Sequence, residues 1–312
     1  MKYAFIMNPV SGNGKKIIQF EENLNKKAKE LGIEIKKYRT TEIGGAEKLA
    51  YTIAEEAAES SEKLRIYACG GDGTVSEVVN GIAGFGNVAM GIIPVGSGND
   101  FARNFASNKD FLDVNKLFEE KEKKIDLLKY TYMENGKPVS HYCANGINIG
   151  FDGNTAILAH HLQEYPIIAG SFSYLLSVIA NVYKMLGQNL RVIADGKMIH
   201  RGKLLMCTVS NGKFCGGGIQ SCPRALMDDR KAEVLVIKNI TRRKFFQIFP
   251  KFYAGRFFET KNADRISQYA QAESVTVEPL RKTMQFVVDG EIITTGTLNI
   301  KTEHDAITIL VP

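Results

Sequence analysis

Short apolar runs alternate with amphipathic segments over the first third of the chain. Four short segments are typical of strands, at Tyr3–Met7, Ile33–Tyr38, Leu64–Cys69 and Ala89–Ile93. The segments between them carry apolar side chains at helical spacing, which predicts helices over Ile17–Leu31, Ala46–Ser60 and Val75–Ile82. Because strands that alternate with helices form a parallel sheet with helices on its faces, we expect an α/β domain over residues 1–128.

The pattern changes near residue 125, after which apolar and polar positions alternate. Strands are predicted at Lys129–Met133, His141–Ile149, Leu190–Ala194, Leu204–Ser210, Ala232–Lys238, Val275–Pro279, Met284–Val288 and Thr297–Ile300. Turns that contain Asn-Gly or Asp-Gly separate some of them, as in antiparallel hairpins, and helical segments interrupt at 155–187 and 242–258. We therefore expect a mainly antiparallel β domain over residues 129–312, whose last residues can return to the first domain.

Composition and cysteine usage indicate a folded protein of the cytoplasm. Hydrophobic residues make up 44% of the 312 residues and charged residues 24%, and no run of about 18 apolar residues is present. No secretory signal is recognisable at the N-terminus, and five scattered cysteines without a CxxC pair favour a reducing compartment. The net charge of +6 is compatible with solubility alone or with attraction to polyanions such as nucleotides or an anionic membrane.

Three glycine-rich loops each follow a predicted strand, at Asn8–Gly12, Gly70–Thr74 and Pro94–Asp100. Parallel sheets bind ligands at the carboxyl ends of their strands, so the three loops are expected to converge. Glycine lets backbone N–H groups approach an anion closely, and the hydroxyls of Ser11, Thr74 and Ser97 can donate further hydrogen bonds. Asp72 can hold a metal or accept a proton. The loops therefore predict a phosphate-binding site, although neither GxxxxGK[ST] nor GxGxxG is present.

The order of these motifs closely resembles that of the diacylglycerol kinase catalytic domain. The matching residues are Asn8-Pro9-x-Ser11-Gly12, Gly70-Gly-Asp-Gly-Thr74, Glu77-Val-Val-Asn-Gly81 and Gly96-Ser-Gly-Asn-Asp-Phe-Ala102. The resemblance continues in order with Asn211-Gly212, Gly216-Gly-Gly218, Pro223-x-Ala225, Asp228-Asp229 and Val288-Asp-Gly-Glu291. It therefore spans nearly the whole chain, which is similar to soluble bacterial lipid kinases of the diacylglycerol kinase, YegS and sphingosine kinase superfamily.

The resemblance implies a fold and an activity. The fold would be a phosphofructokinase-like α/β nucleotide-binding domain, with a mostly parallel sheet, followed by an antiparallel β-sandwich that binds lipid. The activity would be transfer of the γ-phosphoryl group of ATP, with Mg²⁺, to the hydroxyl of diacylglycerol or a related lipid, a step of phospholipid biosynthesis.

The resemblance also implies roles for single residues. The nucleotide would be surrounded by Asn8, Pro9, Val10, Ser11, Gly12, Thr41, Gly71, Asp72, Gly73, Thr74, Val75, Ser76, Glu77 and Ser97, with Thr40 as an alternative to Thr41. Asn99 and Asp100 would bind the substrate, and Asp72, Asp289 and Glu291 would be catalytic, with Glu291 as the proton acceptor. Magnesium would be held by Asp229 with the backbone oxygens of Leu226 and Lys231. The family usually has Asn in place of Ser76 and Gly in place of Arg230.

The chemistry of phosphoryl transfer leaves alternatives for these residues. An acceptor alcohol must lose its proton, and a carboxylate within hydrogen-bond reach can take it, so Asp72, Asp289 and Glu291 are all candidates. Asp289-Gly-Glu291 on its own is equally typical of a hairpin turn. An NAD kinase shares the Gly-Gly-Asp-Gly-Thr loop but would not be expected to carry the later motifs. A non-catalytic lipid- or nucleotide-binding regulator is the alternative outside the enzymes.

The segment Arg242–Lys261 combines six Lys or Arg residues and seven Phe or Tyr residues with a single acid, Glu259. This composition is typical of a segment that lies on a membrane surface. It is also typical of a helix that packs its rings on a core, with Pro250 at a kink. The expected partner is a lipid alcohol at an anionic membrane surface and not a nucleic acid. We expect a cytoplasmic protein that is peripheral at the inner face of the membrane, and a homodimer is left open.

Overall fold

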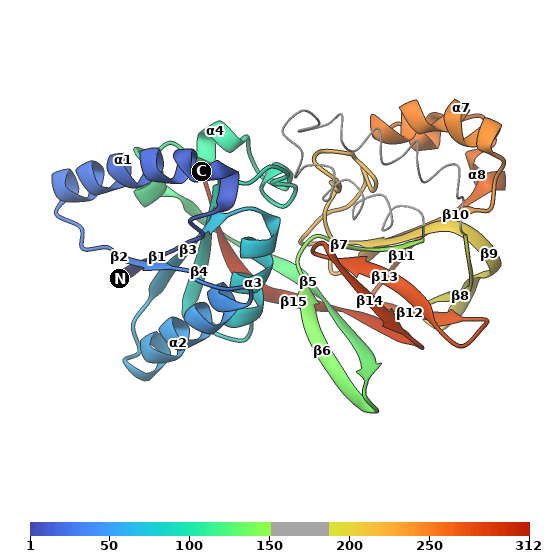
Figure 1. Ribbon diagram of the computed structural model, residues 1–312, viewed down its shortest axis with the longest axis horizontal. Coiled ribbons are helices and arrows are strands. Elements are labelled where there is room, and N and C mark those ends of the chain that lie inside the picture. Colours follow the sequence, from blue (N-terminus) through green and yellow to red (C-terminus); the bar gives the residue numbers. More distant parts are fainter. Residues whose placement is uncertain (151–186) are drawn as a thin grey trace. The chain divides into compact units, whose positions relative to one another are not determined.

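The computed structural model describes residues 1–150 and 187–312, which form two compact units (Figure 1). Unit 1 comprises Met1–Leu127 and His304–Pro312, and unit 2 comprises Leu128–Glu303. The helical segment predicted over 155–187 lies outside the described residues except for Gly187. No helix of the described residues is both long enough and apolar enough to cross a membrane.

Unit 1 is built on a parallel sheet with the strand order β2-β1-β3-β4-β15. The strands are β1 (Lys2–Met7), β2 (Lys36–Arg39), β3 (Leu64–Gly70), β4 (Val88–Pro94) and the last part of β15 (Leu298–Val311). The helical elements are η1 (Ser11–Asn13), α1 (Lys15–Leu31), α2 (Gly45–Glu59), α3 (Asp72–Ile82), η2 (Ala102–Asn104), α4 (Asn108–Phe111) and η3 (Leu117–Glu119). The four predicted strands and three predicted helices of this region are confirmed, with small shifts of their ends.

Helices cover both faces of this sheet, with α1 on one side and α2 and α3 on the other (Figure 1). The buried residues of α1 recur every three or four positions, at Ile17, Phe20, Leu24 and Ala28. The first three join Phe5 and Met7 of β1 in one hydrophobic cluster, which holds α1 on the sheet. The helix was predicted from the spacing of Ile18, Leu24, Ala28 and Leu31, and of these Ile18 and Leu31 are exposed, so the predicted apolar face was only partly right.

Helix α3 begins at Asp72, inside the predicted Gly70–Thr74 loop, so that part of the loop prediction is wrong. Gly71 is extended, and its carbonyl already accepts the helical hydrogen bond from the Val75 N–H at 3.1 Å. The chain therefore passes from strand to helix within two residues. This short connection places the amino end of α3 directly at the edge of the sheet.

Unit 2 is a mainly antiparallel β structure. Its strands are β5 (Lys121–Glu134), which begins in unit 1, β6 (Lys137–Cys143), β7 (Gly146–Gly150), β8 (Gln188–Ala194), β9 (Lys197–Ser210), β10 (Ala232–Lys238), β11 (Ser267–Ala272), β12 (Ser274–Pro279), β13 (Met284–Val288), β14 (Glu291–Thr295) and the first part of β15. The long strand β9 is central, because its first half pairs with β8 and its second half pairs with both β7 and β10. The sheet thereby divides into two layers that pack around one hydrophobic core.

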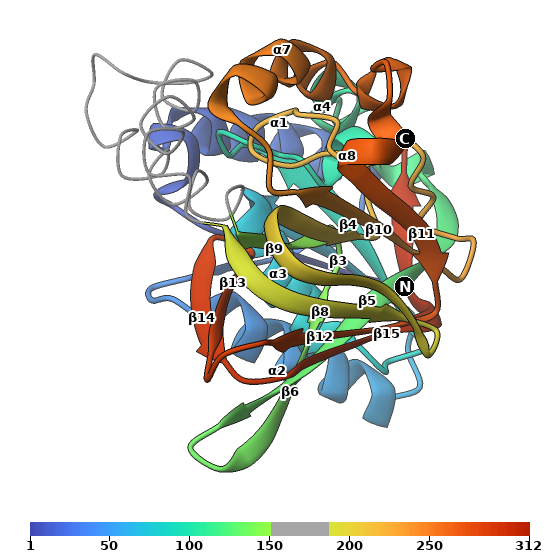
Figure 2. The ribbon, with the colours of Figure 1, turned by 90° about the vertical axis from the view of Figure 1, so that its right-hand side faces the viewer.

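Alternate residues of β10 point to two different hydrophobic clusters. Val234 and Val236 belong to the core between the β layers, whereas Leu235 and Ile237 face a second cluster. The second cluster lies beneath three helical elements, α7 (Arg242–Tyr253), η4 (Phe257–Glu259) and α8 (Ala263–Ile266), which Figure 2 shows above β10 and β11. The helix predicted near 242–258 is therefore confirmed, and it ends earlier than predicted.

Two strand predictions in unit 2 need correction. The predicted strand His141–Ile149 is divided between β6 and β7, because Asn145 turns away to bind the loop after β9. Its carbonyl accepts from the Asn211 and Gly212 N–H groups at 2.8 and 2.9 Å. Strands β11 and β14 were not predicted. The β11 sequence Ser-Gln-Tyr-Ala-Gln-Ala lacks β-branched residues, and pairing with the buried strand β10 overrides its weak propensity.

A buried tyrosine and a buried carboxyl group join β3 to the segment that leads into β5. The Tyr67 hydroxyl donates a hydrogen bond of 3.0 Å to a carboxylate oxygen of Glu120 and is equally close to the Leu117 carbonyl. The Arg65 guanidinium donates to the Phe118 and Glu120 carbonyls. Burial raises the pKa of Glu120 to about 7, against the opposing effects of the Tyr67 hydrogen bond and the Arg65 charge.

This raised pKa predicts a pH-dependent stability. Between the ordinary pKa of 4.5 and about 7, folded Glu120 holds a proton that the unfolded chain has lost. The free energy of unfolding should therefore fall as pH rises through this window, by at most about 1.4 kcal/mol per pH unit. Glu120→Gln should remove that dependence, so the variant should gain on the parent between about pH 5 and pH 8 in urea unfolding. Glu119→Gln at the exposed neighbour is the control. A pH-independent difference for Glu120→Gln would contradict the assignment.

Candidate active site

The three glycine-rich loops leave the sheet of unit 1 at the same level. Met7 pairs with Cys69 and with Arg39, and Gly70 pairs with Pro94. The residues that follow these strand ends therefore lie side by side at the carboxyl edge of the sheet. This confirms that the loops are neighbours, as parallel strands require.

Direct contacts join the loops to one another. The Asn8 amide donates a hydrogen bond of 3.1 Å to the Thr74 hydroxyl, and the Val95 N–H donates to the Gly70 carbonyl at 3.1 Å. A Cβ on Gly96 would collide with the Gly71 backbone, because the two loops touch main chain to main chain. Gly12 has a φ of +58°, and a Cβ there would collide with the Val95 carbonyl. The glycines are therefore required by the loops' own packing as well as by any ligand.

Two helix amino ends open onto the same edge. Helix α1 begins at Lys15 directly after η1, and α3 begins at Asp72 directly after Gly71. The first turn of α1 contains Lys15 and Lys16 and no acid, so cationic side chains add to the positive end of the helix dipole. Backbone N–H groups, a helix dipole and cations together favour a bound phosphate.

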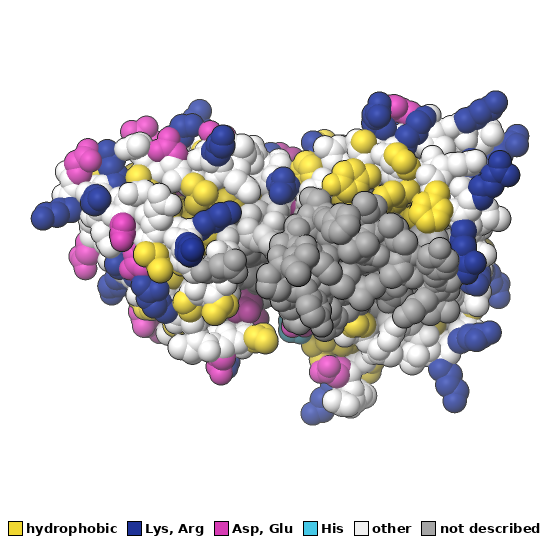
Figure 3. Space-filling view, turned by 45° about the horizontal axis from the view of Figure 1, so that its top comes forward, with side chains coloured by type: hydrophobic (Ala, Val, Ile, Leu, Met, Phe, Trp, Pro, Cys, Tyr) yellow, Lys and Arg dark blue, Asp and Glu magenta, His cyan; other side chains and the backbone are white. Residues whose placement is uncertain are grey.

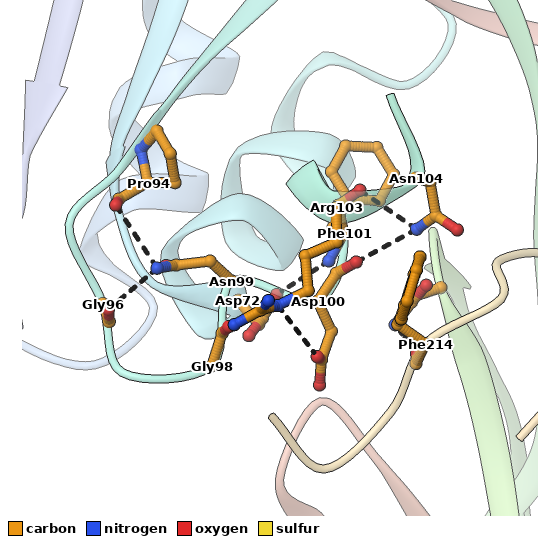
Figure 4. Close-up of polar contacts among 11 residues, drawn as sticks. Asp72, Pro94, Gly96, Gly98, Asn99, Asp100, Phe101, Arg103, Asn104 and Phe214 are labelled. Atoms are coloured by element: carbon orange, nitrogen blue, oxygen red, sulfur yellow. Dashed lines mark hydrogen bonds and ion pairs between the residues drawn. The ribbon is translucent and has the colours of Figure 1, made fainter. Parts of the chain in front are cut away.

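Asp72 lies in the first turn of α3 and is held by the third loop (Figure 4). One carboxylate oxygen accepts a hydrogen bond of 3.1 Å from the Phe101 N–H. Burial raises the pKa of Asp72, and hydrogen bonds from the backbone of residues 99–101 oppose that rise. A Cβ on Gly98 would lie 2.7 Å from the other carboxylate oxygen, so that glycine leaves room for the charge. Asp72 therefore connects two loops and places a carboxylate at the carboxyl edge of the sheet, where a phosphate-binding site is predicted.

The two predicted substrate-binding residues brace the third loop from within. Asn99 is 5% exposed, has a φ of +57°, and donates from its amide to the Gly96 and Pro94 carbonyls at 2.8 and 3.3 Å. Asp100 is equally buried and lies 3.8 Å from the Arg103 guanidinium (Figure 4). Arg103 is exposed and also donates to the Gly98 carbonyl at 3.2 Å. Sequence reasoning missed Arg103, although a cation three residues after Asp100 was a usable signal.

The other predicted nucleotide-binding residues of unit 1 take different positions. Exposed or half-exposed positions at the edge are those of Asn8, Pro9, Val10, Ser11, Gly12, Thr41, Gly71, Gly73, Ser76 and Ser97, whereas Thr74 and Val75 are buried. Thr40, the alternative to Thr41, is 9% exposed, and its N–H donates to the Met7 carbonyl. The Glu77 carboxylate accepts from the Ala46 N–H at 2.9 Å, in the first turn of α2. That bond gives Glu77 a structural role in fixing α2 on α3.

Unit 2 presents two carboxylates on a hairpin between β13 and β14. Asp289 and Gly290 form its two-residue turn, with φ of +51° and +90°, and Glu291 is the first residue of β14. Both acids are exposed. They lie near the buried Tyr130, whose pKa is raised first by burial and then by the charges around it, including those of Asp289 and Glu291. The hairpin turn that the sequence also allowed is therefore present, and it holds both carboxylates at its tip.

The predicted magnesium ligands lie in a turn before β10. The Asp229 carboxylate accepts a hydrogen bond of 3.1 Å from the Lys231 N–H, and Arg230 between them has a φ of +66°. Glycine adopts this left-handed conformation most readily, which agrees with the glycine that the family resemblance implies at this position. Leu226 is exposed. In the described part of the chain no cluster of three or more His, Cys, Asp or Glu side chains could hold a metal. The predicted magnesium site uses one carboxylate and two backbone oxygens, so it is not a cluster of this kind. It remains a prediction.

Comparison with known proteins identifies the class of this chain. The diacylglycerol kinase catalytic domain family matches residues 2–130, and the YegS C-terminal NAD kinase beta sandwich-like domain matches residues 146–311. The chain is 28% identical to a diacylglycerol kinase of Bacillus subtilis over 303 residues, covering 93% of this chain and 90% of that protein. It is 29% identical to a diacylglycerol kinase of Staphylococcus aureus, covering 92% and 84%. The chain therefore belongs to the diacylglycerol kinase family and is a lipid kinase.

Solved structures share the fold. A diacylglycerol kinase of Bacillus anthracis aligns with a TM-score of 0.70 at 22% identity, covering 100% of this chain and 97% of that one. Yeast NADH kinase complexed with NADH aligns with a TM-score of 0.55 at 12% identity, covering 100% and 84%. These likenesses concern the fold alone. They confirm an α/β domain followed by an antiparallel sandwich-like domain, as the sequence predicted.

Gly73 offers a test of the loop site that folding does not complicate. A Cβ there would meet no atom within 4 Å, and its φ is ordinary, so the fold does not require a glycine. Gly73→Ala should therefore leave the melting temperature unchanged or slightly raised. It should lower kcat/KM for ATP by about 10²-fold, because the methyl group would hold a phosphate away from the backbone. Gly86→Ala, which also meets no atom, is the matched control. An unchanged kcat/KM for ATP in Gly73→Ala would remove this residue from the site.

Proposed function

We propose that this chain transfers the γ-phosphoryl group of ATP to the hydroxyl of diacylglycerol or a related lipid, at an anionic membrane surface. The observation that supports this most is the joining of three glycine-rich loops, two helix amino ends and Asp72 at one edge of unit 1. Phosphoryl transfer depends on positioning and charge stabilisation more than on covalent help from the protein, and this edge supplies both.

In this proposal the loops of unit 1 hold the nucleotide. Backbone N–H groups of the Asn8–Gly12 and Gly70–Thr74 loops bind phosphate oxygens, with Ser11 and Ser97 as hydroxyl donors. Lys15, Lys16 and Arg103 offset the phosphate charge from exposed positions. Asn99 and Asp100 act through the loop that they brace, so their effect on the substrate is one of positioning.

Proton removal from the acceptor alcohol is assigned to Glu291, with Asp289 as its neighbour. Both carboxylates are exposed and therefore accessible to a substrate hydroxyl. As the first residue of β14, Glu291 is held by strand pairing with Val288. A carboxylate in this position can take the hydroxyl proton while the oxygen attacks phosphorus.

Magnesium is part of the proposal, and the chain offers oxygen donors of the kind that it prefers. When bound, the ion would neutralise phosphate charge. A separate, structural ion would be held by the Asp229 turn, through one carboxylate and the carbonyls of Leu226 and Lys231. For the ion at the phosphates the Asp72 carboxylate is the candidate, because it lies at the carboxyl edge of the sheet in the first turn of α3.

A phosphotransfer assay tests the function directly. Labelled ATP would be offered with diacylglycerol, monoacylglycerol, phosphatidylglycerol, sphingosine, ceramide, undecaprenol and NAD, with and without Mg²⁺. We expect labelling of diacylglycerol or a close relative, and none of NAD. Asp72→Ala should abolish it while the protein stays folded, because the lost group is a polar side chain at the amino end of α3 and no apolar core packing is removed.

Asp72→Asn separates the two roles of that residue within the same assay. The amide oxygen can still accept the Phe101 N–H, so the loop stays held while the charge is lost. Activity should still fall by about 10²-fold or more. Near-normal kcat in Asp72→Asn would reduce Asp72 to a positioning residue, and labelling of NAD alone would replace the lipid kinase proposal by an NAD kinase.

A conservative exchange tests the proton acceptor. Glu291→Gln keeps size and hydrogen bonding but cannot take a proton, so kcat should fall by about 10²–10⁴-fold with little change in ATP affinity. Asp289→Asn in the same hairpin is the matched variant and should be milder. If Asp289→Asn is severe and Glu291→Gln mild, the two roles are exchanged.

The setting of the reaction follows from its substrate. A lipid alcohol lies in a bilayer, so the proposal places the protein in the cytoplasm, peripheral at the inner face of the membrane. Fractionation of cells that express the chain tests this location, and recovery away from the membrane in low salt would contradict it. The homodimer stays a prediction, which sedimentation velocity decides against a monomer of 34.6 kDa.

A further inference from the structure

Helix α7 attaches to unit 2 by one face. Phe245, Ile248 and Phe252 recur at spacings of three and four and are each at most 6% exposed. They pack in the second hydrophobic cluster of unit 2, with Phe257 of η4 and Leu235 of β10. Part of the aromatic content of Arg242–Lys261 is therefore core, as one of the two sequence interpretations held.

A second stripe of aromatic rings lies on the adjoining flank of the helix. Phe246 is 50% exposed and Tyr253 is 43% exposed, while Phe249 between them is half-buried. Phe249 stacks on Phe245 with ring centroids 5.4 Å apart, and its centroid lies 6.2 Å from that of Tyr253. The stripe is thus supported from the core and presents two large rings to solvent. Exposed rings of this size are unfavourable in water unless a partner covers them.

The charges of α7 oppose the stability of the isolated helix. Arg242, Arg243 and Lys244 occupy its first turn, which contains no acid. Cations at a helix amino end are repelled by the helix dipole. They are not needed for capping, because the Thr241 hydroxyl already accepts the Lys244 N–H. A negatively charged surface that faced these cations would offset their repulsion by the helix dipole.

The basic character extends beyond the helix. Arg256, Lys261 and Arg265 are exposed on the following turns. The Arg224 guanidinium lies over the Phe258 ring at 4.1 Å and over the Tyr269 ring at 5.3 Å, and such stacking holds its planar group in place. Figure 3 shows hydrophobic side chains gathered in the part of unit 2 that carries α7, with Lys and Arg side chains along its outer edge.

We infer that this flank of α7 is the surface by which the protein docks on an anionic bilayer. The rings of Phe246 and Tyr253 enter the interface between headgroups and acyl chains, and the cations at 242–244 bind the headgroup phosphates. The inference rests on the proposed lipid substrate. It goes further by naming the docking surface and by requiring both anionic lipid and aromatic insertion.

Co-sedimentation with vesicles tests the inference without any measurement of activity. The parent should bind phosphatidylcholine vesicles that contain phosphatidylglycerol, should bind pure phosphatidylcholine weakly, and should be released as salt rises. The combined Arg242→Gln, Arg243→Gln and Lys244→Gln variant should bind anionic vesicles about 10- to 100-fold more weakly at low salt. A matched variant removes three exposed cations elsewhere in unit 2, by Lys197→Gln, Arg201→Gln and Lys203→Gln, and should bind like the parent.

A second variant tests the rings separately. Phe246→Gln with Tyr253→Gln changes only exposed side chains, so its thermal unfolding should match that of the parent. It should bind anionic vesicles more weakly, and the binding that remains should be abolished by salt. If either α7 variant binds anionic vesicles as tightly as the parent, the inference is wrong. Equal binding of the parent to neutral vesicles, or tighter binding to single-stranded RNA than to anionic vesicles, would also overturn it.

Activity then distinguishes docking from chemistry. Both α7 variants should raise apparent KM for diacylglycerol presented in anionic vesicles, while kcat on a short-chain diacylglycerol in solution stays that of the parent. If the parent phosphorylates neither substrate, the proposed function fails, but the vesicle result still decides whether α7 docks. A loss on the short-chain substrate as large as that on vesicles would show that α7 serves the active site and would contradict a docking role.

Discussion

The contact of main chain with main chain between two strand-to-helix loops is the constraint on which unit 1 depends. Gly71 and Gly96 approach so closely that a Cβ on Gly96 would lie 2.4 Å from the Gly71 Cα atom, and a Cβ on Gly71 would lie 3.3 Å from the Gly96 Cα atom. The approach is possible because the register of β3 and β4 ends both strands at the same level. A shift of that register by one residue would separate the loops and exchange the residues that β4, buried along its whole length, presents to the two faces of the sheet. The register of the sheet therefore determines where the loops of the predicted phosphate site lie.

Asp72 shows how a residue can serve the fold and the chemistry together. Its carboxylate holds the third loop through the Phe101 N–H, and in the proposed function the same group acts beside the phosphates of the nucleotide. Burial raises its pKa, and the backbone donors oppose that rise. The loop therefore lowers the pKa of the carboxylate that holds it, against the effect of burial. A cofactor or substrate that moved this loop would also change the acidity of the group.

Much of the fold could be predicted from the sequence because its signals are local. The run Leu64–Cys69 is apolar except for Arg65, and apolar residues recur at helical spacing within Ile17–Leu31. Strand β11 could not be found in this way, because its small and polar residues are ordered by pairing with β10. The start of α3 at Asp72 was hidden for a similar reason, since glycines are read as loop whether or not a helix begins there.

The candidate site was predictable as a set of motifs and not as a set of contacts. The three loops were identified by their glycines, but the bond from Ala46 to Glu77 joins residues of two helices and has no local signature. Asn99 and Asp100 were assigned to substrate, and that assignment stays a prediction; the structure adds that both side chains are buried in the third loop. A motif does not reveal such support of a loop, because the hydrogen bonds that provide it depend on how the chain folds.

Strand β15 has a consequence for how the chain is made. Its last residues belong to unit 1, where they pair with β4, although all of unit 2 precedes them in the sequence. During synthesis β4 therefore remains an unpaired edge strand of the unit 1 sheet until the roughly 175 residues of unit 2 have been made. Unit 1 cannot complete its fold before unit 2 has been synthesised. Unit 1 is completed only after residues 304–312 have been synthesised and have paired with β4.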